Sequence, residues 1–362
     1  PYFTAADRQE ILRDIEAVLE SGRLTLGPRL KEFESQFAGK VGATFSVGVT
    51  SATAGLHMSM LALGIKPGDE VIVPAKTFVS TANAPVYCGA KPVFCDVQPD
   101  SMNMDPKDLR KLVTTRTRAV IPVHVAGQPC DMDEIMEVCD ANSIDVVEDS
   151  AHAPYALYKE KVAGTIGKIG VYSFYPDKVI ASSDGGMLVT ADEELADRLH
   201  LLRNCGRRNL REPDIVSIGY NYRMNELQAV LGIHQLKTLD EMLETRRLLA
   251  RYYDEQLEGM EGIAAPTTAP GRTHDYYAYV VFLEGFDRDA FQAKLAERGI
   301  ETALMFKPVY LHKPYLDMGY GPGLCPVAEQ ISENTVSIPL HPGLSTDDAG
   351  YVIDEIKEIL SE

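Results

Sequence analysis

An amine, a carboxylate and an imidazole lie close together along the middle of the chain. Lys178 ends the stretch Ser173-Phe-Tyr-Pro-Asp-Lys178, and Asp149 and His152 lie upstream in Glu148-Asp-Ser-Ala-His152. A lysine amine can hold an aldehyde cofactor as a Schiff base, and a carboxylate can pair with a pyridinium nitrogen. Together these residues predict pyridoxal 5′-phosphate as the cofactor, with Lys178, Asp149 and His152 as the catalytic residues.

Each residue alone also has an ordinary explanation. Lys178 by itself reads as a surface loop lysine, and Asp149 as a helix cap. A single histidine is more often structural, but His152 shares the segment of Asp149 and can cover a cofactor ring or orient the aspartate. The pair, flanked by Ser173 and by Gly185-Gly186, favours a cofactor site.

Small residues in segment 49–56, between an expected strand and an expected helix, offer a phosphate site. The unpaired N–H groups at a helix start bind anions. Ser51, Ala52 and Thr53 are therefore predicted to bind the cofactor phosphate, with the Ser173 hydroxyl as a further ligand; a plain Ser/Thr helix cap is the alternative. The segment lacks the lysine of a P-loop and the Gly-x-Gly-x-x-Gly spacing of a dinucleotide fold, which disfavours a nucleotide cofactor.

Two further features have open interpretations. Phe78 follows an expected strand and either stacks on a flat cofactor ring or belongs to the core. The basic segment Asn204-Cys-Gly-Arg-Arg-Asn-Leu-Arg211, with Arg203 beside it, either captures an anionic substrate group such as a diphosphate or forms a solvated loop.

Composition excludes several classes of function. A net charge of −18 over 362 residues argues against a nucleic acid partner, which needs a dense basic face. No apolar run approaches the ~20 residues that span a bilayer, so no membrane association is predicted. No two of the six cysteines have Cys-x-x-Cys spacing, so neither a disulfide framework nor a metal site is predicted. Without a signal-like N-terminus, the expected location is the cytoplasm.

Short apolar runs alternate with helical periodicity between about residues 45 and 190. The expected strands are Phe45–Val49, Val71–Pro74, Pro92–Asp96, Ala119–Pro122, Asp145–Glu148, Gly170–Phe174 and Gly186–Thr190. The expected helices between them are Ala54–Leu63, Val79–Tyr87, Pro106–Leu112 and Met132–Asn142. This alternation indicates parallel βαβ units in a sheet covered on both faces, with ligands at the carboxyl ends of the strands. Residues Ser51, Phe78, Asp149 and Lys178 are thus predicted to converge on one crevice.

The C-terminal part has a different character. One long helix is expected from Arg223 to Leu257, and it joins the two halves of the chain. Beyond it, the expected elements are a strand Tyr277–Leu283, a helix Arg288–Arg298, a loop Pro308–Pro326, a strand Thr335–Pro339 and a helix Thr346–Leu360. We therefore predict a large domain, residues 1–245, and a smaller α+β domain, residues 246–362.

An ordered set of motifs runs over nearly the whole chain. It comprises Gly27-Pro28 with Phe33-Glu34, Ser51-Ala-Thr-Ala54, Leu61-Ala-Leu-Gly-Ile-Lys-Pro-Gly-Asp-Glu-Val-Ile-Val-Pro74, Thr77-Phe78, Glu148-Asp149, Ser173-Phe174, Lys178, Gly219-Tyr-Asn-Tyr-Arg-Met-Asn-Glu226, Gln235-Leu236 and Ser337-Ile-Pro-Leu340. With these motifs the chain resembles the DegT/DnrJ/StrS-type sugar aminotransferases, which have the aspartate aminotransferase fold (fold type I). The resemblance implies an α/β fold in which the large domain, with an N-terminal arm, holds a mostly parallel seven-stranded sheet between helices.

The resemblance also implies a role for each site residue. Lys178 is the Schiff-base lysine and Asp149 the partner of the pyridinium nitrogen. Ser51, Ala52, Thr53 and Ser173 bind the phosphate, while Phe78 and His152 flank the ring. Asn221 reaches the phosphate of the neighbouring subunit, so that a homodimer is the minimal active unit. Two positions depart from the common pattern, since His152 often appears as Gln in relatives and Val179 replaces a frequent Asn.

The implied reaction moves an amino group from an amino acid, glutamate or glutamine, to a keto sugar. The expected acceptor is a sugar nucleotide with a 3- or 4-keto-6-deoxyhexose. Three alternatives remain open: a keto-cyclitol acceptor, a cofactor-dependent sugar dehydratase, which Lys178 disfavours because such relatives carry His at this position, and a non-catalytic regulator of the same fold.

Overall fold

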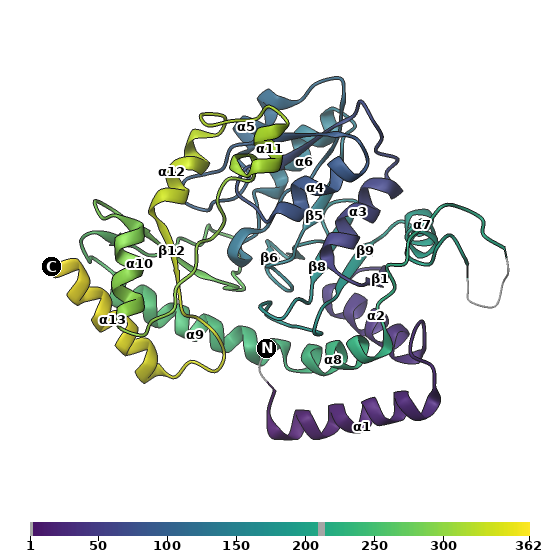
Figure 1. Ribbon diagram of the computed structural model, residues 1–362, viewed down its shortest axis with the longest axis horizontal. Coiled ribbons are helices and arrows are strands. Elements are labelled where there is room, and N and C mark those ends of the chain that lie inside the picture. The colour runs from purple at the N-terminus through teal and green to yellow at the C-terminus, as the bar shows by residue number, and fades with distance from the viewer. Residues whose placement is uncertain (1–2, 209–213) are drawn as a thin grey trace.

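The computed structural model describes residues 3–208 and 214–362. Within these residues a large sheet lies between layers of helices, and a smaller antiparallel sheet with its own helices lies beside it, as Figure 1 shows. The mostly parallel seven-stranded sheet that was predicted is confirmed.

The large sheet has the strand order β1-β9-β8-β5-β4-β2-β3. Its strands are β1 (Phe45–Val49), β2 (Glu70–Pro74), β3 (Lys91–Cys95), β4 (Thr117–Val120), β5 (Asp145–Asp149), β8 (Ile169–Ser173) and β9 (Gly186–Thr190). Strand β9 runs antiparallel to both β1 and β8, and the other neighbours pair in parallel. The carboxyl ends of β2, β5 and β8 therefore lie at the same edge of the sheet.

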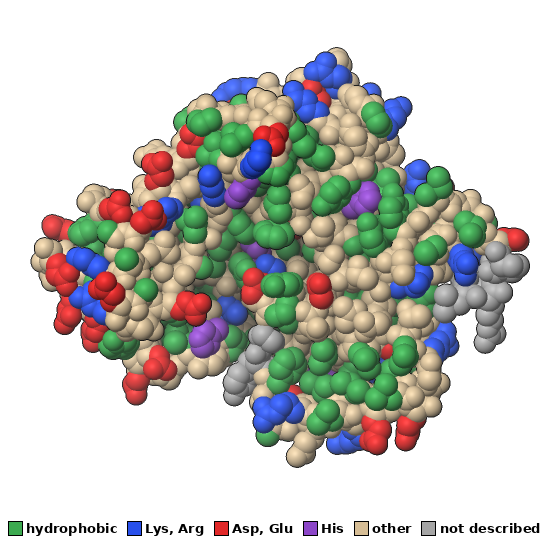
Figure 2. Space-filling model, viewed as in Figure 1, with side chains coloured by type: hydrophobic (Ala, Val, Ile, Leu, Met, Phe, Trp, Pro, Cys, Tyr) green, Lys and Arg blue, Asp and Glu red, His purple; other side chains and the backbone are tan. Residues whose placement is uncertain are grey.

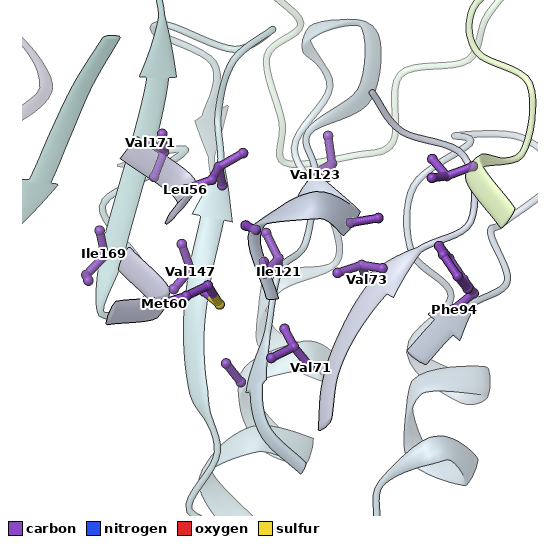
Figure 3. Packing of buried hydrophobic residues seen from close by; sticks show 14 of the residues in the cluster. Leu56, Met60, Val71, Val73, Phe94, Ile121, Val123, Val147, Ile169 and Val171 are labelled. Carbon is purple, nitrogen blue, oxygen red and sulfur yellow. The ribbon is translucent and has the colours of Figure 1, made fainter. Parts of the chain in front are cut away.

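Helices cover both faces of this sheet. Successive side chains of each strand point to opposite faces, and apolar side chains on both faces are buried against helices. Val71 and Val73 pack in one cluster with Leu56 and Met60 of α3, as Figure 3 shows, whereas Ile72 between them packs in another. The helices of this half are α1 (Ala5–Ser21), α2 (Pro28–Val41), α3 (Ala52–Ala62), α4 (Val79–Tyr87), α5 (Pro106–Leu112), α6 (Met132–Ala141), α7 (Glu193–Arg203) and α8 (Glu226–Lys237). A 3₁₀ turn (Val125–Gly127) and a small hairpin of β6 (Leu157–Tyr158) and β7 (Lys161–Val162) complete it.

The smaller sheet has the order β10-β11-β12, all antiparallel, with its own apolar cluster. Its strands are β10 (Ile263–Ala264), β11 (Tyr279–Leu283) and β12 (Thr335–Ile338). The helices of this C-terminal part are α9 (Leu239–Leu257), α10 (Arg288–Glu297), α11 (Lys313–Asp317), α12 (Pro326–Asn334) and α13 (Thr346–Ser361), with a 3₁₀ turn at Val309–Leu311. Helix α11 packs against the large half, since its Tyr315 belongs to the same apolar cluster as Phe94 of β3. The predicted domain boundary between residues 245 and 246 falls inside α9 and stays a prediction.

The prediction of one helix from Arg223 to Leu257 is wrong. The helix begins only at Glu226, because Asn225 forms a capping box with Gln228. It then ends at Lys237, because the backbone of the C-cap residue Thr238 leaves the helical region (φ −100°, ψ 2°) and its hydroxyl donates to the Gln235 carbonyl over 3.2 Å. A second helix, α9, starts at the residue after Thr238. The expected loop Pro308–Pro326 also contains one short helix, α11.

Candidate active site

Eight of the nine predicted site residues line one cavity of about 1030 Å³ at the carboxyl ends of the strands. They are Ser51, Ala52, Thr53, Phe78, Asp149, His152, Ser173 and Lys178. Residues 301–306 and 337–341 of the smaller half close the opposite wall. Figure 2 shows this face of the molecule hollowed near its centre, with charged side chains beside the hollow.

The start of α3 lines the cavity and presents its first-turn amides there. Ser51 is the N-cap, and its hydroxyl accepts from the amide of Ala54 over 3.2 Å. The hydroxyl of Thr53 hydrogen-bonds with that of Ser80 on α4 over 2.7 Å. The amide of Ala52 belongs to the first turn, and the N–H groups of a first helical turn have no partner within the helix and can bind an anion.

Gly186 allows this helix start to approach the sheet. A Cβ at position 186 would lie 2.6 Å from the amide nitrogen of Ala52 and 2.7 Å from the carbonyl carbon of Ser51. Any side chain there would push the first turn of α3 outward. Gly186 of the predicted Gly185-Gly186 pair therefore has a packing role directly behind the first-turn amides of α3.

Asp149 ends β5 and is buried at the base of the cavity. Burial raises the pKa of its carboxyl, and the hydrogen bond from Thr81 is the largest influence in the opposite direction. The Thr81 hydroxyl donates to Oδ2 over 2.8 Å, and the Ala151 amide donates to Oδ1 over 3.2 Å. No ion pair to Asp149 occurs among the described residues, so the carboxylate can take a cationic partner from the cavity.

His152 presents a flat, neutral ring. It is buried, and its ring stacks on that of Tyr277 with centroids 4.1 Å apart and planes 7° apart. Its Nδ1 has no hydrogen-bond partner among the residues that the structure describes. Burial, with a contribution from Lys178, lowers the pKa of the imidazole well below its ordinary value. The ring of Phe306 is also stacked against it, at 5.6 Å.

The amine of Lys178 lies inside the cavity, and its side chain is 13% exposed. Nζ donates to the hydroxyl of Tyr277 over 3.2 Å and lies 3.2 Å from Oδ1 of Asp177. Burial lowers the pKa of this amine, whereas Asp177 and, at longer range, Asp149 raise it. An amine that is buried and shifted in this way can act as a nucleophile or base.

The remaining aromatic and hydroxyl groups lie at the cavity wall. Phe78 is the N-cap of α4, is 56% exposed and is tilted against Phe306 at 6.2 Å. Its exposure excludes the alternative of a core phenylalanine. Ser173 lies at the end of β8.

Asn221 does not join the other predicted residues. It is exposed and pairs with Asn204 in an isolated antiparallel bridge, outside the cavity lining. In the basic segment, Arg207 and Arg208 are exposed, and residues 209–211, with Arg211, lie outside the described residues. Arg203 is no anion ligand, because it is buried and binds Glu34 and the carbonyl oxygen of Gly48.

Sequence reasoning did not single out three side chains of the site. Thr81 supports Asp149, Asp177 pairs with Lys178, and Tyr277 contacts both His152 and Lys178. Thr81 follows Thr77 of the Thr77-Phe78 motif by four residues, a spacing at which side chains can meet, and in the structure the two hydroxyls lie 2.8 Å apart. Asp177 directly precedes the lysine. No local signal points to Tyr277, because it is 99 residues from Lys178.

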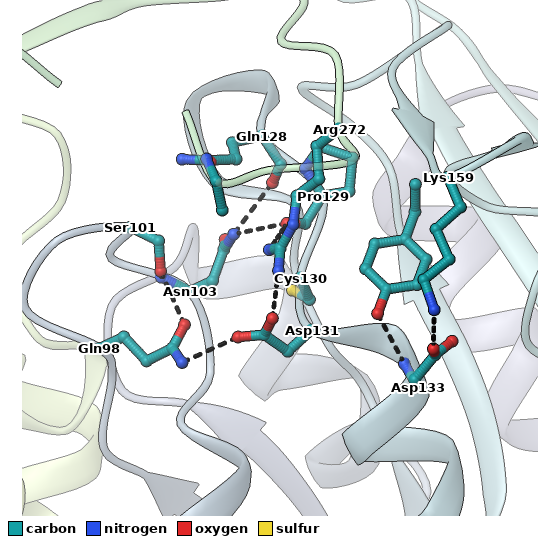
Figure 4. A network of polar contacts seen from close by, with 12 residues as sticks. Gln98, Ser101, Asn103, Gln128, Pro129, Cys130, Asp131, Asp133, Lys159 and Arg272 are labelled. Carbon is teal, nitrogen blue, oxygen red and sulfur yellow. Dashed lines mark hydrogen bonds and ion pairs between the residues drawn. The ribbon is translucent and has the colours of Figure 1, made fainter. Parts of the chain in front are cut away.

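A polar network holds the segment that carries Tyr277 against the large sheet. Figure 4 shows Arg272 reaching Asp131 and the carbonyl of Pro129, and Asn103 donating to the carbonyls of Gln128 and Pro129. The two hydrogen bonds of Asn103 measure 3.0 and 3.2 Å. Closer to the site, the amide of Asp275 donates to the Gly127 carbonyl over 3.0 Å. The position of Tyr277 thus depends on contacts with the loop that follows β4.

The described residues fit pyridoxal 5′-phosphate. The first turn of α3 offers amides for a phosphate, and the buried Asp149 offers a carboxylate for a ring nitrogen. His152 offers a flat ring face, and Lys178 offers an amine that lies over the ring of Tyr277, on which His152 stacks. These four groups lie in one cavity.

Comparison with known proteins gives one consistent result. Residues 5–357 match the DegT/DnrJ/EryC1/StrS aminotransferase family. The chain is 38% identical over 353 residues to dTDP-3-amino-3,4,6-trideoxy-alpha-D-glucose transaminase of Streptomyces venezuelae (97% of this chain, 92% of the relative). It is 36% identical over 340 residues to GDP-perosamine synthase of Caulobacter vibrioides (93% and 91%).

Solved structures of similar proteins have the same fold as this chain. DesV of S. venezuelae, in complex with a ketimine intermediate, superposes with a TM-score of 0.94 at 37% identity (98% of this chain, 95% of that chain). Spr1654 of Streptococcus pneumoniae in its PLP form superposes with a TM-score of 0.94 at 29% identity (100% and 97%). No helix in the described part of this chain is both long enough and apolar enough to cross a membrane.

Proposed function

We propose a nucleotide-linked 3- or 4-keto-6-deoxyhexose as the amino acceptor of this chain. The chain itself belongs to the DegT/DnrJ/EryC1/StrS family and is a pyridoxal 5′-phosphate-dependent sugar aminotransferase. The proposed amino donor is glutamate. Two relatives support a sugar nucleotide, because their names contain a dTDP-linked and a GDP-linked sugar. They differ in the nucleotide, so neither nucleotide is assigned.

One observation carries the proposed roles: Lys178, Asp149 and His152 meet in a single cavity. When bound, the cofactor supplies an aldehyde for the lysine and a ring that takes up negative charge from the amino acid α-carbon. Lys178 holds the cofactor, and its amine, once free, moves the proton between the donor α-carbon and the cofactor C4′. Asp149 keeps the ring nitrogen protonated, which makes the ring a stronger electron acceptor.

The other predicted residues position the cofactor. Ser51, Ala52 and Thr53 bind its phosphate through the first turn of α3, and the hydroxyl of Ser173 adds a further ligand. His152 covers one face of the ring. It carries no charge at neutral pH, because its pKa lies well below the ordinary value, so it does not oppose protonation of the ring nitrogen. Phe78, exposed toward the cavity, flanks the ring as well.

The active unit in this proposal is a homodimer. A keto sugar nucleotide and glutamate are both anionic, yet Lys178 is the only lysine or arginine among the described residues that line the cavity. Exposed polar groups at Asn221, Arg207 and Arg208 lie outside the lining. We propose that Asn221 reaches the phosphate site of the neighbouring subunit, where it completes the set of phosphate ligands.

Mixed dimers test this arrangement. Lys178→Ala and Asn221→Ala each remove one component, so each protein alone should be inactive or nearly so. If Asn221 serves the neighbouring site, a mixed dimer contains one site with both residues intact, and mixing should restore activity. Activity that stays absent in a mixture shown to exchange subunits would place Asn221 in its own site, and full activity of Asn221→Ala alone would show that it serves neither site.

The acceptor is tested in two half-reactions. Incubation with glutamate should convert the bound cofactor to its amine form, seen as a change in absorbance. A panel of 3- and 4-keto sugar nucleotides, with keto-cyclitols beside them, should then restore the original spectrum only with the true acceptor. Borohydride treatment before glutamate should attach the cofactor to Lys178, located by peptide mass mapping; attachment to another residue would refute the assignment of this lysine.

A further inference from the structure

Asp177 and Tyr277 form a closed set of contacts with the amine of Lys178. Nζ lies 3.2 Å from Oδ1 of Asp177 and 3.2 Å from the hydroxyl oxygen of Tyr277. The tyrosine hydroxyl in turn donates to Oδ2 of Asp177 over 3.0 Å. Both oxygens of one carboxylate are thus engaged, one by the amine and one by the hydroxyl that also contacts the amine.

Tyr277 is held in place by a different set of contacts. Its ring stacks on His152, and Nζ of Lys178 lies 4.2 Å from the ring centroid, within the range of a cation–π interaction. An ammonium at this position meets a carboxylate, a hydroxyl acceptor and the face of an aromatic ring.

The other titratable groups around the cavity do not offer an equivalent contact. His152 is neutral, and Asp149 is engaged by Thr81 and the Ala151 amide. The cavity wall also contains Asp184, Glu301 and His341, none of which hydrogen-bonds to Nζ. Asp177 is therefore the one carboxylate among the described residues in direct contact with the amine.

We propose that Asp177 and Tyr277 are positioning residues that form a docking site for the protonated amine of Lys178 whenever that amine is not bonded to the cofactor. This inference rests on the proposed role of Lys178. The amine alternates between a bonded and a free state in the two half-reactions. The docking site keeps the free amine beside the ring and stabilises its ammonium form from the moment it has taken up a proton until it passes that proton on. No bond to Asp177 or Tyr277 is formed or broken in this step.

The test measures Lys178 in the cofactor-free protein, independently of turnover. An acylating reagent reacts only with the neutral amine, so the rate of acylation at Lys178, followed by peptide mass mapping across a pH series, reports the protonation of Nζ. Asp177→Asn removes the charge with almost no change of shape, and the side chain is 53% exposed, so the fold should persist. We expect the acylation profile of Asp177→Asn to move to lower pH, with several-fold faster acylation on its acid side.

Two further variants make the result specific. Asp184→Asn removes a negative charge from the same cavity without removing a contact to Nζ, and its profile should match that of the parent protein. Tyr277→Phe keeps the stacked ring and loses the hydroxyl, so it should give a smaller shift in the same direction. An unchanged profile in Asp177→Asn, or an equal shift in Asp184→Asn, would overturn the proposal.

This outcome can be separated from failure of the proposed function. The acylation profile needs neither cofactor nor substrate, whereas the role of Lys178 is tested by borohydride attachment. Attachment of the cofactor to another residue would refute the role of Lys178, but the acylation profile of Lys178 would still test the docking site. A normal attachment with an unchanged profile would refute only the docking site.

Discussion

Thr81→Val tests how the buried carboxylate of Asp149 is kept ionised. The Thr81 hydroxyl donates to Oδ2 of Asp149 over 2.8 Å, and both residues are buried. A hydrogen bond to a charged group contributes about 1.5–3 kcal/mol. Since about 1.4 kcal/mol corresponds to a factor of ten, loss of the hydroxyl should disfavour the ionised carboxyl roughly 10- to 150-fold.

The direction of the pH effect follows from the charge on Asp149. Burial already raises its pKa, and Thr81 opposes that shift, so the variant should raise the pKa further. The ring nitrogen of the cofactor pairs with the ionised form. Cofactor affinity should therefore be highest above this pKa and fall as the pH drops through it, and in Thr81→Val the fall should begin at a higher pH.

The assay is the dissociation constant of pyridoxal 5′-phosphate from the cofactor-free protein, measured by absorbance across a pH series. Thr190→Val is the matched control. It removes a buried hydroxyl that donates to the Lys168 carbonyl over 2.9 Å, at the end of β9 away from Gly186. If Thr81→Val and Thr190→Val give the same affinity profile as the parent protein, the reasoning about Asp149 is wrong.

Three other predictions concern the surroundings of the site. Gly186→Ala should lower the free energy of unfolding by about 1–3 kcal/mol and weaken cofactor binding, because the new Cβ would lie 2.6 Å from the Ala52 nitrogen. Calorimetry measures the first effect and cofactor titration the second, and unchanged binding would contradict the role of the close approach. Glu226→Gln should lower the free energy of unfolding, measured in urea, by about 1.5–3 kcal/mol. The reason is that the Glu226 carboxylate accepts hydrogen bonds from three backbone amides at the start of α2, over 2.8, 2.9 and 3.1 Å. A decrease below about 0.5 kcal/mol would argue against this cap. Burial lowers the pKa of Lys76 to about 7, so the unfolded chain binds more protons than the folded protein between about pH 7 and pH 10.5. The parent protein should therefore gain stability relative to Lys76→Met as the pH rises through this window, and parallel stability curves would show that Lys76 titrates normally.

Much of the fold could be predicted because its signals are local. The period of apolar residues marks each strand of the large sheet, and the alternation with helices indicates parallel pairing. The errors arose where a local pattern continues across a break. Helical spacing runs through Thr238, and only its hydrogen bond to the Gln235 carbonyl and its backbone angles separate α8 from α9.

Some residues of the site could likewise be predicted from local signals, whereas the roles of others could not. Lys178, Asp149 and the 51–53 segment are recognisable because each follows a strand, and parallel strands place their carboxyl ends at one edge. Glu226 stands in a recognisable motif, yet its task, capping α2 across 199 residues, is visible only in the folded chain.

The amino-acid sequence by itself determined the chemistry of this protein: a lysine, an acid and an anion-binding helix start, each at a strand end. Only the tertiary structure decided what surrounds them. Tyr277 reaches Lys178 from 99 residues away, and Thr81 reaches Asp149 from 68. Such contacts depend on the register of the sheet and on how the smaller half packs against it, and neither is written in the spacing of neighbouring residues.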